Sequence, residues 1–112
     1  MSQNRPELIK KFIGIASNTI THRILLRTEL EEDIRKYYNK EIERDIDIAL
    51  KYRNMINRVD NTLPEKDAEE IKDKIVLKVR AELLKRINKG YNIDISLIEV
   101  EVDKFLKEHK VD

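Results

Sequence analysis

The chain has 112 residues, a length that favours one domain covering residues 1–112. Its 23 lysines and arginines nearly balance its 22 aspartates and glutamates, so overall charge gives no attraction to nucleic acid or to an anionic membrane. Because the chain contains no cysteine, disulfide bonds, a thiolate nucleophile and a cysteine-ligated zinc ion are excluded.

Short polar signals mark the expected helix ends. Pro6 and Pro64 are the only prolines, and a helix tolerates proline in its first turn. Gly90 follows a basic stretch, as a glycine after the last turn of a helix commonly does. A small polar residue precedes a glutamate by three positions, the spacing of a capping box, in four pairs: Asn4 and Glu7, Thr28 and Glu31, Thr62 and Glu65, Ser96 and Glu99. These signals divide the chain into four helices.

The first three helices follow from apolar residues at helical spacing. The first is expected over residues 5–26, and the second, which is the longest, over residues 29–59. Residues 57–64 then make a turn, and the third helix continues to Lys89. A short turn between two long helices predicts that the second and third form an antiparallel hairpin.

The last segment is ambiguous, because residues 93–102 alternate apolar and polar side chains as a half-buried strand does. We predict a helix, since the rest of the chain offers no strand to pair with. In a helix, Ile98, Val102 and Phe105 share one face with His109, which is therefore expected in the core or at an interface. The predicted fold is all-α, a small four-helix bundle with a long antiparallel hairpin and a short C-terminal helix.

Two carboxylates, Glu41 and Asp45, lie in the middle of the apolar stripe of the second helix. A buried carboxylate costs several kcal/mol unless it is paired. Antiparallel pairing places Arg86 of the third helix about one turn from Glu41, which predicts an ion pair between them. Tyr38 and Tyr52 lie near the same stripe and can add hydroxyl groups. The pattern favours a buried polar layer, with a small-ligand or enzyme site at the two carboxylates as an alternative.

The third helix carries apolar residues outside its main stripe, at Leu77, Ala81 and Leu84. A helix that is apolar over more than half its circumference packs against neighbours on two sides. We therefore expect these residues at an interface with a second copy of the chain or with a larger protein assembly.

A basic patch on the first helix points to a different function. Its residues are Lys10, Lys11, Arg23 and Arg27. Such side chains can neutralise phosphates, but acidic residues interrupt the basic ones elsewhere and no nucleic-acid-binding module is recognisable. Binding to nucleic acid therefore remains an alternative.

The segment ASNTITH, residues 16–22, places hydroxyls, an amide and a histidine inside the apolar first helix. Its members that lie opposite the apolar face are Ser17, Asn18, Thr21 and His22. This spacing predicts a solvent- or partner-facing strip with no catalytic residue, while the hydroxyl of Thr19 can bond to a carbonyl one turn earlier. No glutamate precedes His22 or His109 by three residues, so neither a metal centre nor a cofactor is predicted.

Together these patterns favour a non-enzymatic helical module that binds other proteins, in the simplest case as a homodimer. The absence of a signal-peptide pattern and of a long apolar run predicts a cytoplasmic protein with no membrane partner. Abundant Ile, Lys and Glu with a single Gln is typical of thermophile composition.

Overall fold

The computed structural model describes residues 4–57 and 62–111 of the chain. Four helices follow one another along these residues: α1 (Arg5–Leu25), α2 (Glu32–Ile56), α3 (Glu65–Asn88) and α4 (Leu97–Glu108). The described ranges contain no β-strand, so the predicted all-α fold with four helices is confirmed, and the ambiguous last segment is helical from Leu97 onward. Residues 58 and 59, the predicted end of the second helix, lie outside the described residues.

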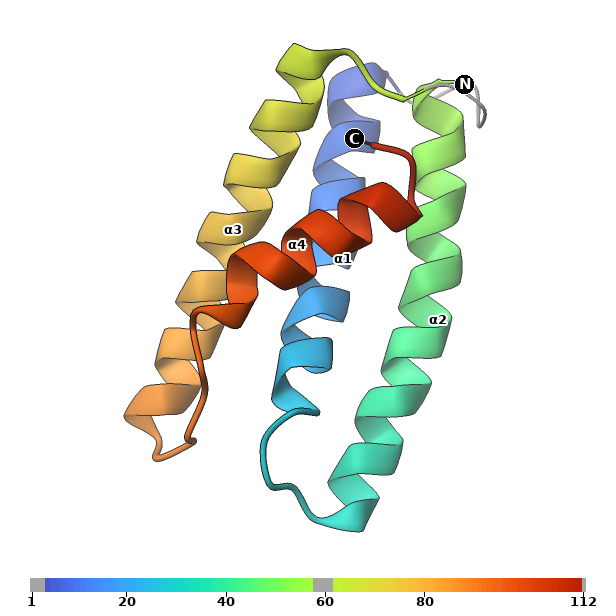
Figure 1. Cartoon of the computed structure of the whole chain (residues 1–112). Coiled ribbons are helices and arrows are strands. Elements are labelled where there is room, and N and C mark those ends of the chain that lie inside the picture. Colours follow the sequence, from blue (N-terminus) through green and yellow to red (C-terminus); the bar gives the residue numbers. More distant parts are fainter. Residues whose placement is uncertain (1–3, 58–61, 112) are drawn as a thin grey trace.

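Helix α1 occupies the centre of the bundle (Figure 1). Helix α2 packs on one side of it, α3 packs on the other, and α4 crosses in front of α1 and α3. Helices α2 and α3 run in opposite directions, as predicted, but their described residues do not contact each other. The two helices of the hairpin therefore pack on opposite sides of α1 instead of forming a pair.

The composition of α1 explains its central place. Residues 12–25 include a single formally charged side chain, Arg23, and burial extends around most of the helix. Helices α2 and α3 carry charges along their whole length, so each can bury only one stripe. None of the described helices combines the length and the apolarity that crossing a bilayer requires.

Aromatic rings join α1 to α4 in the front half of the core. The ring centroids of Phe12 and Phe105 are 6.1 Å apart, and the ring of His109 stacks on Phe105 at 4.0 Å. The Nδ1 atom of His109 donates a hydrogen bond to the carbonyl oxygen of Phe105 over 3.0 Å. His109 is 5% exposed and is therefore a core residue, one of the two positions predicted for it.

The helix ends agree only in part with the predicted capping. Asn4 caps α1, because its Oδ1 accepts a hydrogen bond from the backbone N–H of Glu7 over 2.9 Å. The other three capping boxes were predicted wrongly, since α2, α3 and α4 have no side-chain hydrogen bond at their N-caps. The hydroxyl of Thr28 donates instead to a carbonyl at the end of α1, and that of Ser96 donates to Asp94.

Gly90 ends α3 as predicted. Its φ is 102°, a conformation that favours glycine. Its backbone N–H donates to the carbonyl of Ile87 over 2.9 Å, and that of Tyr91 donates to Arg86 over 3.1 Å. These two bonds form a Schellman motif, which satisfies carbonyls that the helix leaves unpaired.

Arg53 of α2 holds the residues that follow α4 against the bundle by hydrogen bonds. Its guanidinium donates hydrogen bonds to the carbonyl oxygens of His109 over 2.9 Å and Lys110 over 2.7 Å. The backbone N–H of Leu63 donates to the carbonyl of Val111 over 3.3 Å and closes the same end of the bundle. At 1% exposed, Arg53 is among the most deeply buried side chains.

Candidate functional site

A polar cluster surrounds His22 of α1, which lies between α2 and α3. The His22 ring stacks on Tyr38 of α2, with the ring centroids 4.7 Å apart, and both residues are buried. The charged groups that act on His22 come from both flanking helices, and they are Glu41, Arg44 and Asp45 on α2 and Arg86 on α3. These six residues are called the polar cluster below.

The carboxylates of the cluster bind groups on α1 and α2. Asp45 is 2% exposed and accepts hydrogen bonds from Nδ2 of Asn18 over 2.9 Å and from Nε of Arg44 over 3.2 Å. Glu41 is half-buried and forms an ion pair with Arg44 one turn along the same helix. The described part of the chain thus supplies a partner for each mid-stripe carboxylate.

The predicted ion pair between Glu41 and Arg86 is wrong. Glu41 is bound by Arg44, and α1 stands between α2 and α3, so the antiparallel contact on which the prediction rested does not exist. Arg86 instead keeps a buried Nε with no hydrogen-bond partner among the described residues. An unpaired buried donor of this kind is uncommon, and it marks the position as one that a ligand or water can complete.

Burial lowers the pKa of His22 below its ordinary value, because the imidazolium ion loses hydration. The positive charges of Arg86 and Arg44 lower this pKa too, while the negative charges of Glu41 and Asp45 raise it. The net direction is downward, so His22 is neutral at pH 7. Its Nδ1 is buried and has no partner in the described residues.

A cleft of about 290 Å³ lies between α1 and α3 next to the cluster. Arg86 and Lys78 line it from α3, and Gly14, Ser17 and Thr21 line it from α1. A second hollow of about 580 Å³ continues from Lys78 toward the start of α1. In that hollow ion pairs already join Arg5 to Asp67 and Lys74 to Glu70, whereas Arg86 and Lys78 form none within the described ranges.

The polar strip predicted to face solvent or a partner is largely buried within the chain itself. Ser17, Thr21 and His22 are 7%, 3% and 8% exposed, and only Asn18 is classed as exposed. The prediction failed because α2 and α3 flank α1 on both sides. The hydroxyls of Ser17 and Thr21 bond to carbonyls one turn earlier, over 2.7 and 2.8 Å, which makes their burial tolerable. That bond was predicted for Thr19, whose buried hydroxyl has no partner in the described residues.

Tyr52 lies away from the polar cluster. It is half-buried, and the ammonium group of Lys11 lies 5.8 Å from its ring centroid, within the range of a cation–π contact. Of the two tyrosines predicted for the polar layer, the structure therefore brings only Tyr38 to Glu41, Asp45 and Arg86.

The residues of the predicted basic patch are dispersed. Lys10 lines the second hollow between α1 and α3, and Lys11 contacts α2. Arg23 and Arg27 lie on the face that α4 crosses, where they form ion pairs with Glu108 and Glu101, respectively. The four cations therefore form no common surface.

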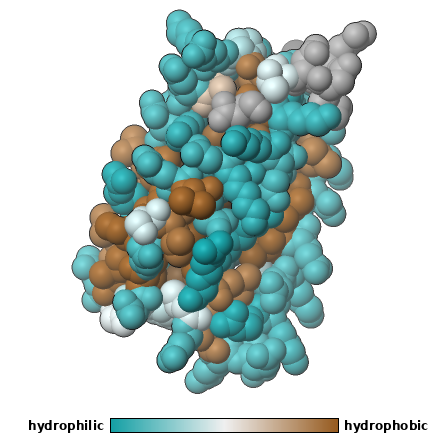
Figure 2. Space-filling view, in the orientation of Figure 1, coloured by the Kyte–Doolittle hydropathy of each residue, from teal (hydrophilic) through white to brown (hydrophobic). Residues whose placement is uncertain are grey.

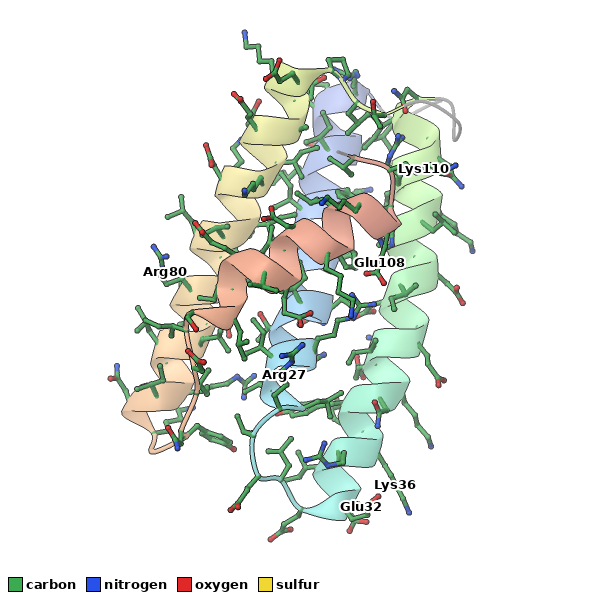
Figure 3. All side chains as sticks on the ribbon, viewed as in Figure 1. Arg27, Glu32, Lys36, Arg80, Glu108 and Lys110 are labelled. Carbon is green, nitrogen blue, oxygen red and sulfur yellow. The ribbon has the colours of Figure 1, made fainter. Side chains whose placement is uncertain are left out.

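The residues predicted at an interface lie on the outer face of α3. Leu77 is 64% exposed, Leu84 is 45% exposed, and Ala81 between them is exposed at the edge of the cleft that it also lines. Arg80 points away from the bundle on this side of α3 (Figure 3). Apolar residues gather along α3 and around the start of α4 (Figure 2). We call Leu77, Ala81 and Leu84 the outer face of α3.

Sequence reasoning missed two buried charges. Arg53 follows Ala49 by four positions and precedes Ile56 by three, and Glu101 follows Ile98 by three, so both continue apolar stripes. Glu101 is 2% exposed and is paired with Arg27. The same helical spacing that singled out Glu41 and Asp45 could have found them.

Residues 4–57 and 62–111 contain no group of three or more side chains placed to hold a metal ion. Comparison of the chain with protein-family models, with curated proteins and with solved structures finds no match.

Proposed function

We propose that this chain is a helical protein-interaction module that self-associates through the outer face of α3. The observation that supports the proposal is the exposure of Leu77 and Leu84 on a helix whose opposite face is already buried against α1 and α4. Leucines exposed one heptad apart on a rigid helix are typical of a helix-to-helix contact surface.

The spacing of the outer face suits a second copy of the same chain. In an antiparallel pair with a two-fold axis near residues 80 and 81, Leu77 of one chain packs against Leu84 of the partner subunit. The small side chain of Ala81 lets the two helices approach at the centre. Two nearby lysines are already neutralised within α3, since Lys74 is paired with Glu70 and Lys85 with Glu82.

The area of the outer face predicts a weak dimer. The exposed fractions of the two leucines add up to about one leucine side chain per copy, which is a small apolar surface beside that of a stable protein interface. The dimer is therefore expected to dissociate on dilution, and its test requires a wide range of concentrations.

Sedimentation equilibrium from about 10 μM to about 1 mM tests the proposal, because that range brackets the affinity of a small interface. The wild type should shift toward a dimer mass, and the Leu77→Glu, Leu84→Glu double variant should remain a folded monomer by circular dichroism. The matched control is Leu50→Glu with Met55→Glu, two exposed apolar residues of α2, which should dimerise like wild type. A wild type that is monomeric at every concentration contradicts the proposal.

Cross-linking tests the antiparallel register. Since the natural chain has no cysteine, single substitutions Leu77→Cys and Leu84→Cys each introduce a unique thiol. Mixing the two variants under oxidising conditions should give mainly the mixed disulfide, because the register places residue 77 against residue 84 of the partner subunit. Self-pairs of each variant in excess would indicate parallel packing and reject this register.

A further inference from the structure

The cleft between α1 and α3 is bounded by cations that have no acid to bind. Arg86 and Lys78 both line it, and neither forms an ion pair with any described residue. The acid that lines the cleft, Glu82, forms an ion pair with Lys85 over 3.2 Å. The cleft therefore presents two positive charges, and the buried Nε of Arg86 has no hydrogen-bond partner among the described residues.

The opposite wall of the cleft is neutral and already hydrogen-bonded. The hydroxyls of Ser17 and Thr21 donate to carbonyls of α1, and the amide of Asn18 donates to Asp45. Gly14 adds no side chain, and a Cβ built there meets no atom within 4 Å. Donors for a ligand therefore come from α3, while α1 supplies space.

We propose that this cleft binds a small oxyanion, the phosphoryl or carboxylate group of a small molecule, between Arg86 and Lys78. The guanidinium group of Arg86 and the ammonium group of Lys78 both carry positive charge into the cleft, and each can form charge-assisted hydrogen bonds with an anionic oxygen. The volume of about 290 Å³ is at the lower limit of ligand pockets, roughly 300 Å³, so the ligand is a compact one.

The pKa of His22, a member of the polar cluster, can report on anion binding at this site. Arg86 acts on His22 by its positive charge, and Arg44, Glu41 and Asp45 act on it from α2. An anion beside Arg86 cancels part of the Arg86 field, so the pKa of His22 should rise when the anion binds. By linkage, protonation of His22 should tighten anion binding. The chain has only one other histidine, His109, which lies against α4 and serves as an internal reference.

The experiment follows both histidine rings and the Nε–H of Arg86 by NMR during titration with inorganic phosphate. A parallel titration uses acetate, and sodium chloride at matched ionic strength provides the baseline. Phosphate or acetate should shift the Arg86 signal saturably and raise the pKa of His22 above its value in chloride, while His109 remains at its chloride value. The titration that gives the lower Kd identifies the phosphoryl or the carboxylate group as the preferred ligand.

Three variants separate the site from general charge effects. Arg86→Gln should weaken binding at least about tenfold, the loss expected for one charge-assisted hydrogen bond. Lys66→Gln removes an exposed cation from the same helix outside the cleft, and it should bind as wild type. Gly14→Leu retains every cation but fills the cleft, and it should abolish binding even if Arg86→Gln proves unstable.

The proposal is overturned if neither phosphate nor acetate moves the His22 and Arg86 signals beyond the chloride baseline. It is equally overturned if Lys66→Gln weakens binding as much as Arg86→Gln, or if Gly14→Leu binds like wild type, because both results would indicate diffuse attraction to surface charge.

Discussion

His22 and His109 are buried on different sides of α1, and neither is compensated by a nearby acid strongly enough to favour its charged form. Burial lowers the pKa of both below the ordinary 6.5. In the unfolded chain each ring recovers an ordinary pKa, so below pH 6.5 the unfolded state binds more protons than the folded one. Protonation of the two rings at low pH therefore favours the unfolded state and lowers the free energy of unfolding.

The free energy of unfolding should consequently fall as the pH drops from about 7.5 to about 5.5, a range in which histidine titrates and carboxylates largely do not. Urea denaturation at several pH values in this range measures it. The His22→Gln, His109→Gln double variant should show a flatter dependence. An unchanged slope in the variant would show that other groups carry the acid sensitivity.

Single residues were predictable from the sequence only where their own helix decides their environment. Asp45 is buried, as its place on the apolar stripe of α2 indicates. The partner of Glu41 was not predictable, because choosing Arg44 over Arg86 depends on α1 standing between two helices that follow each other in the chain. Ser17 and Thr21 were placed wrongly, because a hydroxyl that bonds within its own helix can be buried at little cost.

At the scale of helices, the two glycines of the chain have opposite roles. Gly90 adopts a φ of 102° after α3, where a side chain is strained. Gly14 lies in the middle of α1, where helical φ is negative and a Cβ meets nothing within 4 Å. One glycine is therefore required by backbone geometry, while the other weakens its helix and leaves open the cleft that it lines.

Gly90→Ala should lower the free energy of unfolding by about 1–2 kcal/mol, the cost of an L-residue in a left-handed conformation. Gly14→Ala should raise it by about 0.5–1 kcal/mol, because alanine restricts the unfolded chain and favours the helix. Chemical denaturation of the two variants beside wild type measures both effects. A change of stability in the same direction for both substitutions would contradict the opposite roles assigned to Gly14 and Gly90.

Helix signals in the sequence predicted the existence of each element better than its ends. Asn4 caps α1 as its spacing with Glu7 indicates. Thr28 and Ser96 have the same spacing to a glutamate, yet each hydroxyl binds another local acceptor that competes with the helix end. The spacing of a capping box is therefore not sufficient for a cap, and α2, α3 and α4 begin without one.

At the scale of the whole molecule, Arg53 connects α2 to the C-terminal residues by side-chain hydrogen bonds. It joins α2, which among the described helices contacts α1 alone, to the residues after α4, where the His109 ring also reaches the backbone of Ile46. Arg53→Met should therefore lower the free energy of unfolding by about 2–3 kcal/mol, because carbonyls of His109 and Lys110 lose a charged donor. Chemical denaturation measures the loss.

The matched control for Arg53→Met is Lys51→Met, which removes one cation from an exposed site on the same helix. It should change stability by less than about 0.5 kcal/mol. Equal effects of the two substitutions would mean that loss of charge, and not the hydrogen bonds of Arg53, accounts for the result.

The four-helix architecture was predictable because periodicity within each helix is strong, whereas the packing order was not. Proximity in sequence favours pairing α2 with α3, but α1 has the widest buried surface and takes the central place. Judging which helix is central requires comparing faces between helices, and a helical projection of one segment does not contain that comparison.

The position of α4 also determines the order in which the bundle can close during synthesis. Helices α1 and α2 are neighbours in sequence and in space, so they can pack as soon as both have left the ribosome. The face of α1 that carries Phe12 is covered by Phe105, which is synthesised after the residues of the three preceding helices. Until α4 arrives, the nascent chain displays an apolar face, and this is the stage at which a chaperone or a second nascent chain has access to it.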